Sequence, residues 1–503
     1  MAEPFYMTTA ISYPNGPPHI GHAYEAIAAD AMARFRRSQG RDVKLVTGTD
    51  EHGLKMVQAA RAEGRDTLEY ADEMSAYFRD MYDLLNISYD AFVRTTEPRH
   101  ERASIAIWEA MEAAGDLYLD RYEGWYSVRD EAFYDESELI GGEGGEKLSP
   151  QGTPVEWTAE ETWFFRLSKY QQPLLDLYHD NPAFIRPETR RNEVLRFVEG
   201  GLKDLSVSRT SFDWGVPVPG SPGHVMYVWV DALTTYMTGV GYPDEQDEFE
   251  RYWPADVHLI GKDIVRFHAV YWPAFLMSAK LPLPRQVFGH GFLLSRGEKM
   301  SKSVGNVVDP IALAERFGVD PLRYFLLREV PFGQDGSYSA EAIVNRANAE
   351  LANSFGNLAQ RTLSMVHKNL GGVLPAPGEA GADLELLGLV HEASRKDVPE
   401  AFDRFAFSVG IEAWLRAVFA CNQYVDTQAP WALRKTDPER MAAVLGTLVA
   451  AVRELARAIA PVIPHSADKL MTLIDAGEGG APIAQPVPLF PRLELPEDEE
   501  EAA

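Results

Sequence analysis

The sequence has almost no cysteine, no long hydrophobic run and a shortage of positive charge. Its single cysteine, Cys421, excludes a disulfide framework and any zinc site built from cysteine pairs within one chain. No stretch of eighteen apolar residues exists, which excludes a transmembrane helix. The start of the chain, Met1 to Tyr6, lacks the basic segment and apolar run of a secretory signal, so we expect a cytoplasmic protein.

Acidic residues outnumber basic ones by 75 to 48, which gives a formal net charge of −27. This balance disfavours a protein that coats nucleic acid non-specifically, although it permits a local basic path on an acidic body. The 503 residues are 46% apolar and 24% charged, an ordinary composition for a globular protein with several domains.

Two patterns follow one another along the chain. Strands are predicted at 6–12 and 43–48 around a helix at 23–38, and at 257–261 and 287–289 around a helix at 264–279. This alternation predicts an α/β part with a parallel sheet wound with helices. From 340 to about 473 the pattern changes to long amphipathic helices, of which 441–459 is the clearest, so an all-α part is expected there. An irregular insert between 118 and 217 splits the α/β part.

Two motifs carry candidate chemistry. His19-Ile20-Gly21-His22 lies where the first strand passes into a helix, and the free N–H groups of a helix start suit an anion. Taken alone, the two imidazoles could equally be a metal pair or structural histidines. Lys299-Met300-Ser301-Lys302-Ser303 follows a later strand, and its lysines and hydroxyls suit a polyphosphate whose charge redistributes during reaction.

The two motifs in this order resemble the HIGH and KMSKS motifs of class I aminoacyl-tRNA synthetases, and the best match is the methionyl-tRNA synthetase family. The resemblance covers essentially the whole chain and includes the segments 47–53, 227–232 and 260–264. It implies a Rossmann-type catalytic domain split by a connective insert, followed by a helical anticodon-binding bundle. The boundaries we predict are 1–117 and 223–339 for the catalytic halves, 118–222 for the insert, 340–490 for the helical domain and 491–503 for an acidic tail.

The resemblance implies a ligase that attaches L-methionine to the methionine tRNA through methionyl-adenylate, with ATP and Mg²⁺. The catalytic residues are then His19, His22, Lys299 and Lys302. ATP would be bound by His19, Gly21, His22, Gly261, Asp263, Lys299, Ser301 and Lys302. The Mg²⁺ ion would be held by phosphate oxygens and water more than by protein ligands.

A methionine pocket should be apolar and rich in aromatic rings, because a thioether contacts such rings favourably. The positions that resemble the family pocket are Ile11, Tyr13, Trp229, Leu233, Tyr236, Ile264, His268 and Trp272, with Asp50 for the substrate ammonium. At Leu233 one branch of the family carries proline, a departure that affects the local pocket wall. Core packing remains the alternative for the aromatic residues, and helix capping remains the alternative for Asp50.

Three residues of the helical part resemble the family's anticodon readers. Asn357 and Arg361 stand four apart on one predicted helix face, and Trp431 follows a proline at a helix start. Single-stranded bases are read by aromatic stacking and hydrogen bonds to base edges, which these residues could supply. The alternative is that Trp431 belongs to the core and Arg361 forms a surface ion pair.

The insert departs from the zinc knuckle that many family members carry. Ser127, Asp130, Leu148 and Gln151 occupy the ligand positions, and leucine cannot bind a metal, so we predict no structural zinc. We expect aromatic packing in its place, by Tyr122, Trp125, Tyr126, Phe133, Tyr134 and Trp157.

Other classes of protein share parts of this sequence pattern. The insert is too short for the editing domain that the synthetases for Val, Ile and Leu carry. The synthetase for cysteine holds a catalytic zinc through cysteine, whereas Cys421 lies in the helical part. A small-molecule nucleotidylyltransferase and a catalytically inactive tRNA-binding relative stay open as alternatives. The sequence also shows no appended tRNA-binding domain of the kind used to dimerise, so a monomer without a membrane partner is expected.

Overall fold

The structure is a computed structural model, and it describes residues 2–130, 132–142, 145–295, 298–299 and 307–495. The contacts divide the chain into two units. The first contains Met1–Pro18, Gln39–Asp83 and Ser88–His290, and the second contains His19–Ser38, Leu84–Ile87 and Gly291–Ala503. Among the described residues, no helix has the length and apolar content needed to cross a membrane.

The first unit is built on a six-stranded parallel sheet in the order β3-β2-β1-β13-β14-β9. The strand bounds are Pro4–Thr9 for β1, Asp42–Thr49 for β2, Ala91–Arg94 for β3, Ile185–Arg186 for β9, Val257–Gly261 for β13 and Val287–His290 for β14. The predicted parallel sheet is therefore confirmed. Because the strands run in one direction, the carboxyl ends of β1, β2 and β13 meet at one edge, which is where open α/β sheets bind ligands.

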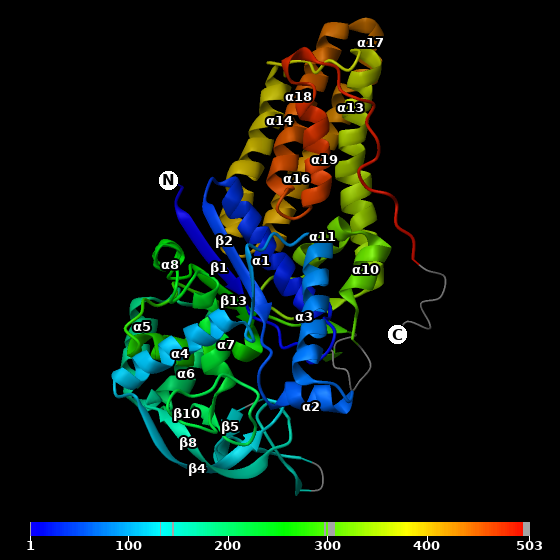
Figure 1. Ribbon diagram of the computed structural model, residues 1–503. Helices are drawn as coiled ribbons and strands as arrows, with labels where there is room; N and C mark the ends of the chain where they lie inside the picture. Colours follow the sequence, from blue (N-terminus) through cyan, green and yellow to red (C-terminus); the bar gives the residue numbers. More distant parts are fainter. Residues whose placement is uncertain (1, 131, 143–144, 296–297, 300–306, 496–503) are drawn as a thin grey trace. The chain divides into compact units, whose positions relative to one another are not determined.

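Helices follow or separate these strands in the first unit (Figure 1). They are α2 (Leu54–Ala62), α3 (Thr67–Leu84), α4 (Pro98–Ala113), α5 (Gln171–Asp180), α6 (Glu188–Glu199), α7 (Val228–Thr238), α8 (Gln246–Tyr252) and α9 (Trp272–Ser278). The helix predicted at 264–279 is divided into a 3-10 turn, η4 (Lys262–Ile264), a π-helical turn, η5 (Phe267–Tyr271), and α9. Such π-turns widen a helix locally and occur often at functional sites.

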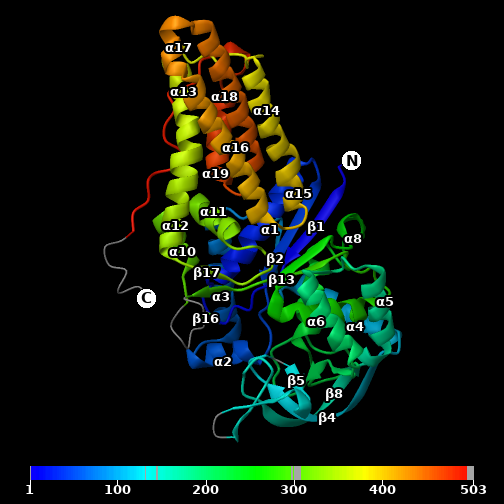
Figure 2. The same ribbon diagram turned by 180° about the vertical axis from the view of Figure 1, so that it is seen from behind.

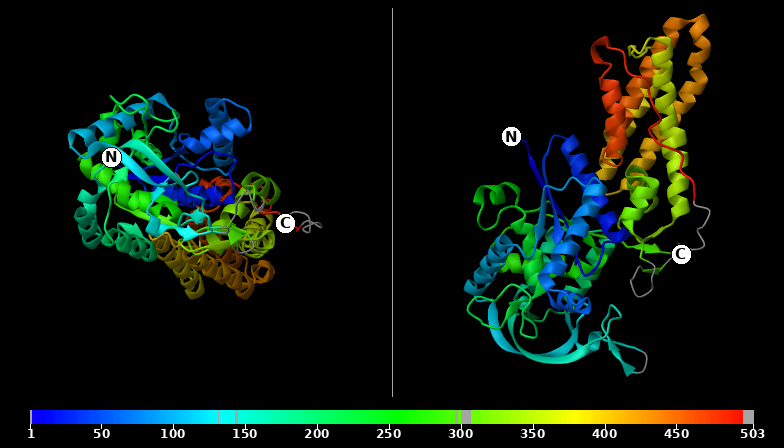
Figure 3. Two further views of the ribbon diagram at one scale, coloured as in Figure 1. Left: turned by 90° about the horizontal axis from the view of Figure 1, so that it is seen from below. Right: turned by 45° about the vertical axis from the view of Figure 1, so that its right-hand side comes forward.

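The sequence suggested an irregular insert, and this prediction is wrong. The insert contains an antiparallel sheet in the order β10-β8-β4-β5. The long strands β4 (Leu117–Ser127) and β8 (Glu156–Phe165) form a curved ribbon, which the right-hand view of Figure 3 shows in cyan. The shorter strands β5 (Ala132–Tyr134) and β10 (Leu205–Ser206) complete this sheet. Two separate two-stranded sheets are formed by β6 (Ile140–Gly141) with β7 (Lys147–Leu148) and by β11 (Ser208–Arg209) with β12 (Val225–Met226). Strand β9 lies within the predicted insert range but pairs with β14 of the parallel sheet.

The second unit is mainly helical (Figure 2). Its elements are α1 (Ile20–Ser38), α10 (Pro310–Phe317), α11 (Val319–Glu329), α12 (Ala340–Arg346), η6 (Ala347–Gly356), α13 (Asn357–Asn369), α14 (Gly381–Glu392), η7 (Ala393–Asp397), α15 (Val398–Phe402), α16 (Phe407–Gln428), α17 (Pro430–Thr436), α18 (Pro438–Ile459) and α19 (Pro464–Asp475). Helix α18 packs against α13, α14, α16, α17 and α19, so it forms the centre of the predicted all-α part. A small sheet, β16-β15-β17, accompanies these helices at Glu298–Lys299, Leu293–Ser295 and Gly336–Tyr338.

A fully buried ion pair joins α1 to the rest of this unit. Arg323 on α11 donates to the Asp30 carboxylate on α1 at 2.6 Å, and to the carbonyls of Pro461 and Val462 at 3.0 Å. Every polar group of such a pair needs a partner, because an unpaired buried charge is strongly destabilising. The helix that carries the first motif is therefore fixed within the same unit as α18 and α19.

Candidate functional site

The two histidines of the first motif form a stacked pair at the start of α1. Their ring centroids lie 3.8 Å apart with an interplanar angle of 27°. The backbone N–H of Gly21 donates to His19 Nδ1, and that of His19 donates to His22 Nδ1, both at 3.1 Å. Since each Nδ1 accepts a hydrogen bond, a neutral ring carries its proton on Nε2. Both rings therefore have an N–H donor suited to phosphate oxygens at a helix N-terminus.

Gly21 is required by this arrangement. A Cβ atom added there would lie 2.9 Å from His19 Cε1, closer than carbon atoms approach without displacement. A larger residue at this position would therefore displace the His19 ring.

Gly261 and Asp263, two of the predicted ATP-binding residues, lie together at the carboxyl end of β13. Gly261 ends the strand, and Asp263 lies in the 3-10 turn η4. A Cβ at Gly261 would lie 2.8 Å from Asp263 Oδ1, so glycine allows the carboxylate to fold back over the strand end. This carboxylate is suited to accept hydrogen bonds from hydroxyl groups.

Of the second motif, the structure describes only the beginning. Lys299 ends β16, which pairs antiparallel with β15 through Leu294. The predicted ATP-binding residues Ser301 and Lys302 lie outside the described residues.

The predicted methionine-binding residues belong to the first unit, and most of them come from two helical segments. Helix α7 carries Trp229, Leu233 and Tyr236, and the η4–η5–α9 segment carries Ile264, His268 and Trp272. The aromatic rings contact one another: Tyr236 lies 5.5 Å from His268 and 6.4 Å from Trp272 between centroids. Trp229 meets the edge of His268 at 5.9 Å and stacks on Phe267 at 3.9 Å.

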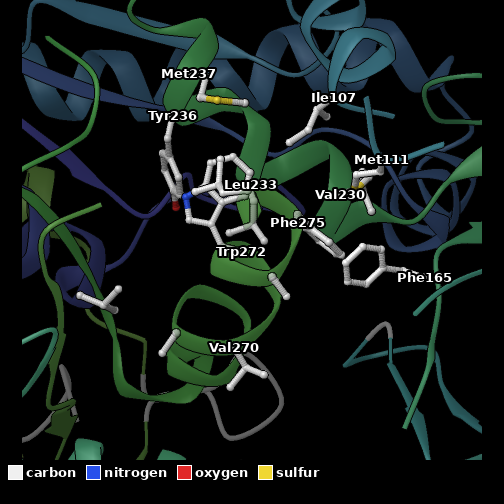
Figure 4. Close-up of a cluster of buried hydrophobic side chains, with 14 of the residues drawn as sticks. Ile107, Met111, Phe165, Val230, Leu233, Tyr236, Met237, Val270, Trp272 and Phe275 are labelled. Carbon is white, nitrogen blue, oxygen red and sulfur yellow. The ribbon is translucent and has the colours of Figure 1, made fainter. Parts of the chain in front are cut away.

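Figure 4 shows Tyr236, Leu233 and Trp272 converging from these helices above a core that contains Phe275 and Val270. Leu233, Tyr236, His268 and Trp272 are buried, whereas Trp229 is only partly buried. The structure thus brings the predicted lining together.

Hydrogen bonds fix the polar atoms of this lining. His268 Nδ1 lies 2.9 Å from the carbonyl oxygen of Ile264, and His268 Nε2 lies 2.7 Å from the Tyr236 hydroxyl. A carbonyl can only accept, so Nδ1 carries the proton and the Tyr236 hydroxyl donates to Nε2. Burial lowers the pKa of His268 to about 4, which keeps the ring neutral at neutral pH.

Ile11, Tyr13 and Asp50 follow the carboxyl ends of β1 and β2. The Asp50 N–H donates to the carbonyl of Ser12 at 2.8 Å, and the Tyr13 hydroxyl donates to the His52 carbonyl at 2.6 Å. Asp50 is 7% exposed. The capping alternative for Asp50 is wrong, because the N-cap of α2 is Gly53, with a φ of 96° and no side-chain cap.

The predicted anticodon residues lie on α13 and α17. Trp431 is the second residue of α17, directly after Pro430, and it is 50% exposed, so the alternative of a core tryptophan is wrong. The Arg361 guanidinium lies 5.6 Å from the Trp431 ring centroid and 3.5 Å from Asp426. Arg361 thus forms the surface ion pair of the alternative and also contacts Trp431. Asn357 begins α13 one turn before Arg361 and is exposed.

A buried charged cluster beside the predicted pocket was not found from the sequence. The Asp231 carboxylate, on α7, lies 2.6 Å from His52 Nδ1 and 2.6 Å from His100 Nε2. The sequence indicated Asp231 only as part of the 227–232 segment, and no regular spacing along the sequence relates it to His52 or His100. It ties the end of β2, next to Asp50, to the helix that carries Trp229 and Leu233.

The donor set of the insert does not fit a zinc ion. Asp130 accepts hydrogen bonds from Tyr134 at 3.0 Å, Ser149 at 2.5 Å and Thr153 at 2.7 Å, and Ser127 bonds to Thr153 at 2.6 Å. Hydroxyls and one carboxylate lack the thiolate and imidazole ligands of structural zinc sites. In the described part of the chain, no group of three or more His, Cys, Asp or Glu side chains is placed to hold a metal.

Aromatic contacts accompany this hydroxyl cluster. Trp125 meets Trp157 at 5.4 Å and Tyr126 meets Phe133 at 4.8 Å between ring centroids, across neighbouring strands of the insert. The buried Arg209 guanidinium lies 4.8 Å from the Phe133 centroid and 4.6 Å from that of Tyr227. The predicted aromatic packing is present at these positions, whereas the side chain of Tyr122 lies outside the described part.

Comparison with known proteins decides between the functions that the sequence left open. The family model described as tRNA synthetases class I (M) matches residues 5–363, and the anticodon binding domain of methionyl tRNA ligase matches residues 375–484. The chain belongs to the methionyl-tRNA synthetase family.

Individual relatives agree with the family models. The chain is 57% identical to a methionine–tRNA ligase of Brucella suis, over 97% of this chain and 98% of the relative. It is 56% identical to that of Mycobacterium bovis, over 99% of each chain. It resembles the Mycobacterium tuberculosis methionyl-tRNA synthetase solved in complex with methionyl-adenylate, with a TM-score of 0.94 and 56% identity over 97% of this chain and 100% of that one.

These findings confirm the predicted fold and function. The chain is a class I ligase that attaches methionine to tRNA, with a Rossmann-type catalytic part and a helical anticodon-binding part. They favour this activity over a small-molecule nucleotidylyltransferase, because that class does not explain an anticodon-binding match over 375–484.

Proposed function

We propose that the predicted residues divide the two-step reaction of the methionyl-tRNA synthetase family among them. In the first step the methionine carboxylate attacks the α-phosphate of ATP, which gives methionyl-adenylate and pyrophosphate. In the second, a ribose hydroxyl of the terminal adenosine of tRNA attacks the methionyl carbonyl of the adenylate, which forms methionyl-tRNA and releases AMP. The protein contributes positioning and charge stabilisation rather than a covalent intermediate.

His19 and His22 act on the phosphates of ATP. The support is their pair geometry, in which both Nδ1 atoms accept backbone hydrogen bonds, so that each neutral ring carries its proton on Nε2. Such preorganised donors favour the transition state, where negative charge on the phosphate oxygens is redistributed. Lys299 and Lys302 neutralise the departing pyrophosphate, and Ser301 and Gly261 also contribute to ATP binding. Asp263 holds the adenosine ribose, and Mg²⁺ arrives with the ATP.

Asp50 binds the ammonium group of methionine, and the rings of Trp229, Tyr236, His268 and Trp272 line the site for its thioether. The carboxylate at the end of β2 supplies a charge-assisted hydrogen bond. The neutral and mostly buried aromatic lining disfavours amino acids with charged side chains as substrates. Ile11, Tyr13, Leu233 and Ile264 complete this lining.

Trp431, Arg361 and Asn357 read the anticodon. We further propose a cytoplasmic monomer without structural zinc, and a tight dimer in sedimentation at low micromolar concentration would contradict the monomer.

Methionine-dependent exchange of pyrophosphate into ATP tests these roles. Lys302→Ala should lower kcat about 10²–10³-fold and leave the methionine KM nearly unchanged, because its charge acts mainly in the transition state. The exposed Lys396→Ala, which breaks only a pair with Glu392, is the control. An unchanged exchange rate in Lys302→Ala would rule its role out.

The histidine pair has a sharper test. His22→Asn keeps an acceptor near the position of Nδ1 but removes the Nε2–H donor, whereas the longer amide of His22→Gln places an N–H near the position of Nε2. We expect kcat to fall about 10²-fold in the asparagine variant and less in the glutamine variant. Equal losses in both would mean that the ring only supports the turn.

A further inference from the structure

His258 is a buried histidine with no role in the site described above. It lies on β13 in the interior of the six-stranded sheet, where its register partner on β1 is Thr8. Its side chain is 0% exposed. His258 Nδ1 lies 2.8 Å from Thr8 Oγ1, and His258 Nε2 lies 3.2 Å from Trp272 Nε1. The ring also packs against Tyr236 with a centroid distance of 4.5 Å.

The chemistry of these partners fixes the tautomer of His258. An indole N–H can only donate, so His258 Nε2 must be the acceptor and Nδ1 carries the proton. Nδ1–H then donates to the Thr8 hydroxyl. Burial, followed by the nearby His268, lowers the pKa of His258 well below its usual value, so the ring stays neutral. The one donor and the one acceptor of the neutral imidazole are both engaged.

Three groups that contact His258 are proposed pocket residues, namely Trp272, Tyr236 and His268, whose ring centroid lies 6.4 Å from that of His258. Trp272 and Tyr236 come from different helices, α9 and α7, and their own centroids lie 6.4 Å apart. A flat indole with an unpaired N–H in an apolar interior would reorient to find a partner, because an unsatisfied buried donor is unfavourable. His258 offers that partner from the rigid sheet, and it packs against the Tyr236 ring at the same time.

We propose that His258 is a positioning residue for methionine selection, which holds the Trp272 indole and the Tyr236 ring in the orientation that accepts the thioether side chain. This role rests on the proposed methionine pocket. It acts through the Trp272 N–H···Nε2 hydrogen bond and not through contact with substrate. The competing interpretation is a core histidine that stabilises the sheet and affects methionine and ATP alike.

Two variants of His258 separate these interpretations. The amide of glutamine stands as far along its side chain as Nε2 and can accept the Trp272 N–H. The amide of asparagine stands at the position of Nδ1 and reaches only Thr8. Both variants lose part of the ring packing, so a purely structural role predicts similar kinetics for the two. The proposed role predicts that glutamine retains methionine selection and asparagine does not.

The measurement is methionine-dependent pyrophosphate exchange, with the KM values of methionine and ATP determined separately. We expect His258→Asn to raise the methionine KM about tenfold while the ATP KM stays within about twofold. His258→Gln should keep a methionine KM within about threefold of the parent. Thr8→Val, which removes the other hydrogen-bond partner and leaves Trp272 untouched, is the matched control and should also stay within about threefold. Equal methionine KM values in the asparagine and glutamine variants would overturn the proposal.

Trp272 supplies the remaining variants. Trp272→Ala tests the pocket itself: an unchanged methionine KM there would overturn the proposed pocket, and with it the role of His258. A raised KM in Trp272→Ala together with a parental KM in His258→Asn would overturn the role of His258 alone. If His258→Asn does not fold, Trp272→Phe takes its place, because it removes the indole donor and keeps an aromatic ring. The proposal requires a methionine KM raised about tenfold in that variant, and a parental value would overturn it.

Discussion

His52 and Asp231 are joined by a 2.6 Å contact between the imidazole Nδ1 and the carboxylate Oδ2. Burial alone would raise the pKa of Asp231, but the charge of His52 and the hydrogen bonds from His100 and His52 hold that pKa well below its usual range. Burial alone would lower the pKa of His52, yet the Asp231 carboxylate raises it above the usual value. The pair is therefore a charged link between the end of β2 and α7, within the first unit.

This link predicts a pH-dependent stability. The depressed pKa of Asp231 stabilises the fold above the unfolded carboxyl value of about 3.9, and this contribution is lost as the pH falls through the folded value. The raised pKa of His52 stabilises the fold below the unfolded value of about 6.5, and this contribution is lost as the pH rises through the folded value. Asp231→Asn should therefore destabilise by about 3–5 kcal/mol near pH 6 and by less near pH 9, measured by thermal melting.

The exposed pair of Asp244 with Arg102 provides the control for that experiment. Asp244→Asn should change stability by only about 0–1 kcal/mol at either pH. An equal loss of melting temperature in Asp231→Asn at both pH values would contradict the charged link.

Asp50 should act on methionine rather than on ATP. Asp50→Asn replaces a charge-assisted hydrogen bond to the substrate ammonium by a neutral one, so the methionine KM should rise about 10- to 100-fold while the ATP KM is unchanged. Pyrophosphate exchange at varied methionine and ATP concentrations measures both. Asp66→Asn is the matched control, because Asp66 accepts the N–H groups of Leu68 and Glu69 at the start of α3. Normal methionine affinity in Asp50→Asn would remove it from the site.

Trp431 should matter for tRNA and not for adenylate formation. Trp431→Ala removes a half-exposed ring suited to stack on an unpaired base, so tRNA charging should fall about 10- to 100-fold while pyrophosphate exchange stays normal. Phe419→Ala on α16 removes an aromatic side chain of similar exposure, 51% against 50%, and should leave both activities unchanged. Loss of both activities in Trp431→Ala would mean that it supports the fold, and normal charging would mean that it reads no base.

The insert should be stable without zinc. Protein purified without added metal should contain far less than stoichiometric zinc by elemental analysis, and a chelator should leave its melting temperature unchanged. Thr153→Val removes the hydroxyl that donates to Asp130 and bonds to Ser127, and should destabilise by about 1–3 kcal/mol with or without chelator. Stoichiometric zinc, or melting that depends on the chelator, would contradict this account.

The sequence predicted elements whose pattern is local. Strand β13 was predicted with its observed bounds, Val257–Gly261, because a short segment that is apolar apart from His258 ends at a glycine. The helix predicted at 264–279 is instead interrupted by the π-turn η5, which the periodicity of apolar residues does not reveal. The strands β4 and β8 of the insert were not predicted, and both are rich in charged and polar residues, which weakens the apolar pattern of a strand.

In the site as well, motifs could be predicted from the sequence but contacts between distant residues could not. The histidine pair and the pocket aromatics were predicted from their motifs and the family resemblance. The hydroxyl cluster around Asp130 and the contacts of His258 join residues far apart in the sequence, with no spacing that relates them. Thr8 and His258 are register partners on neighbouring strands, which only the sheet topology reveals.

The central claim, that this chain activates methionine, is tested most directly by pyrophosphate exchange with a panel of amino acids. Methionine should support exchange with a kcat/KM at least about a hundredfold above those of leucine, isoleucine, valine and cysteine, because the lining must match both the length and the thioether of the side chain. A faster reaction with another amino acid would contradict the assignment. Exchange without any amino acid would indicate a small-molecule nucleotidylyltransferase, and its absence with every amino acid would indicate an inactive tRNA-binding protein.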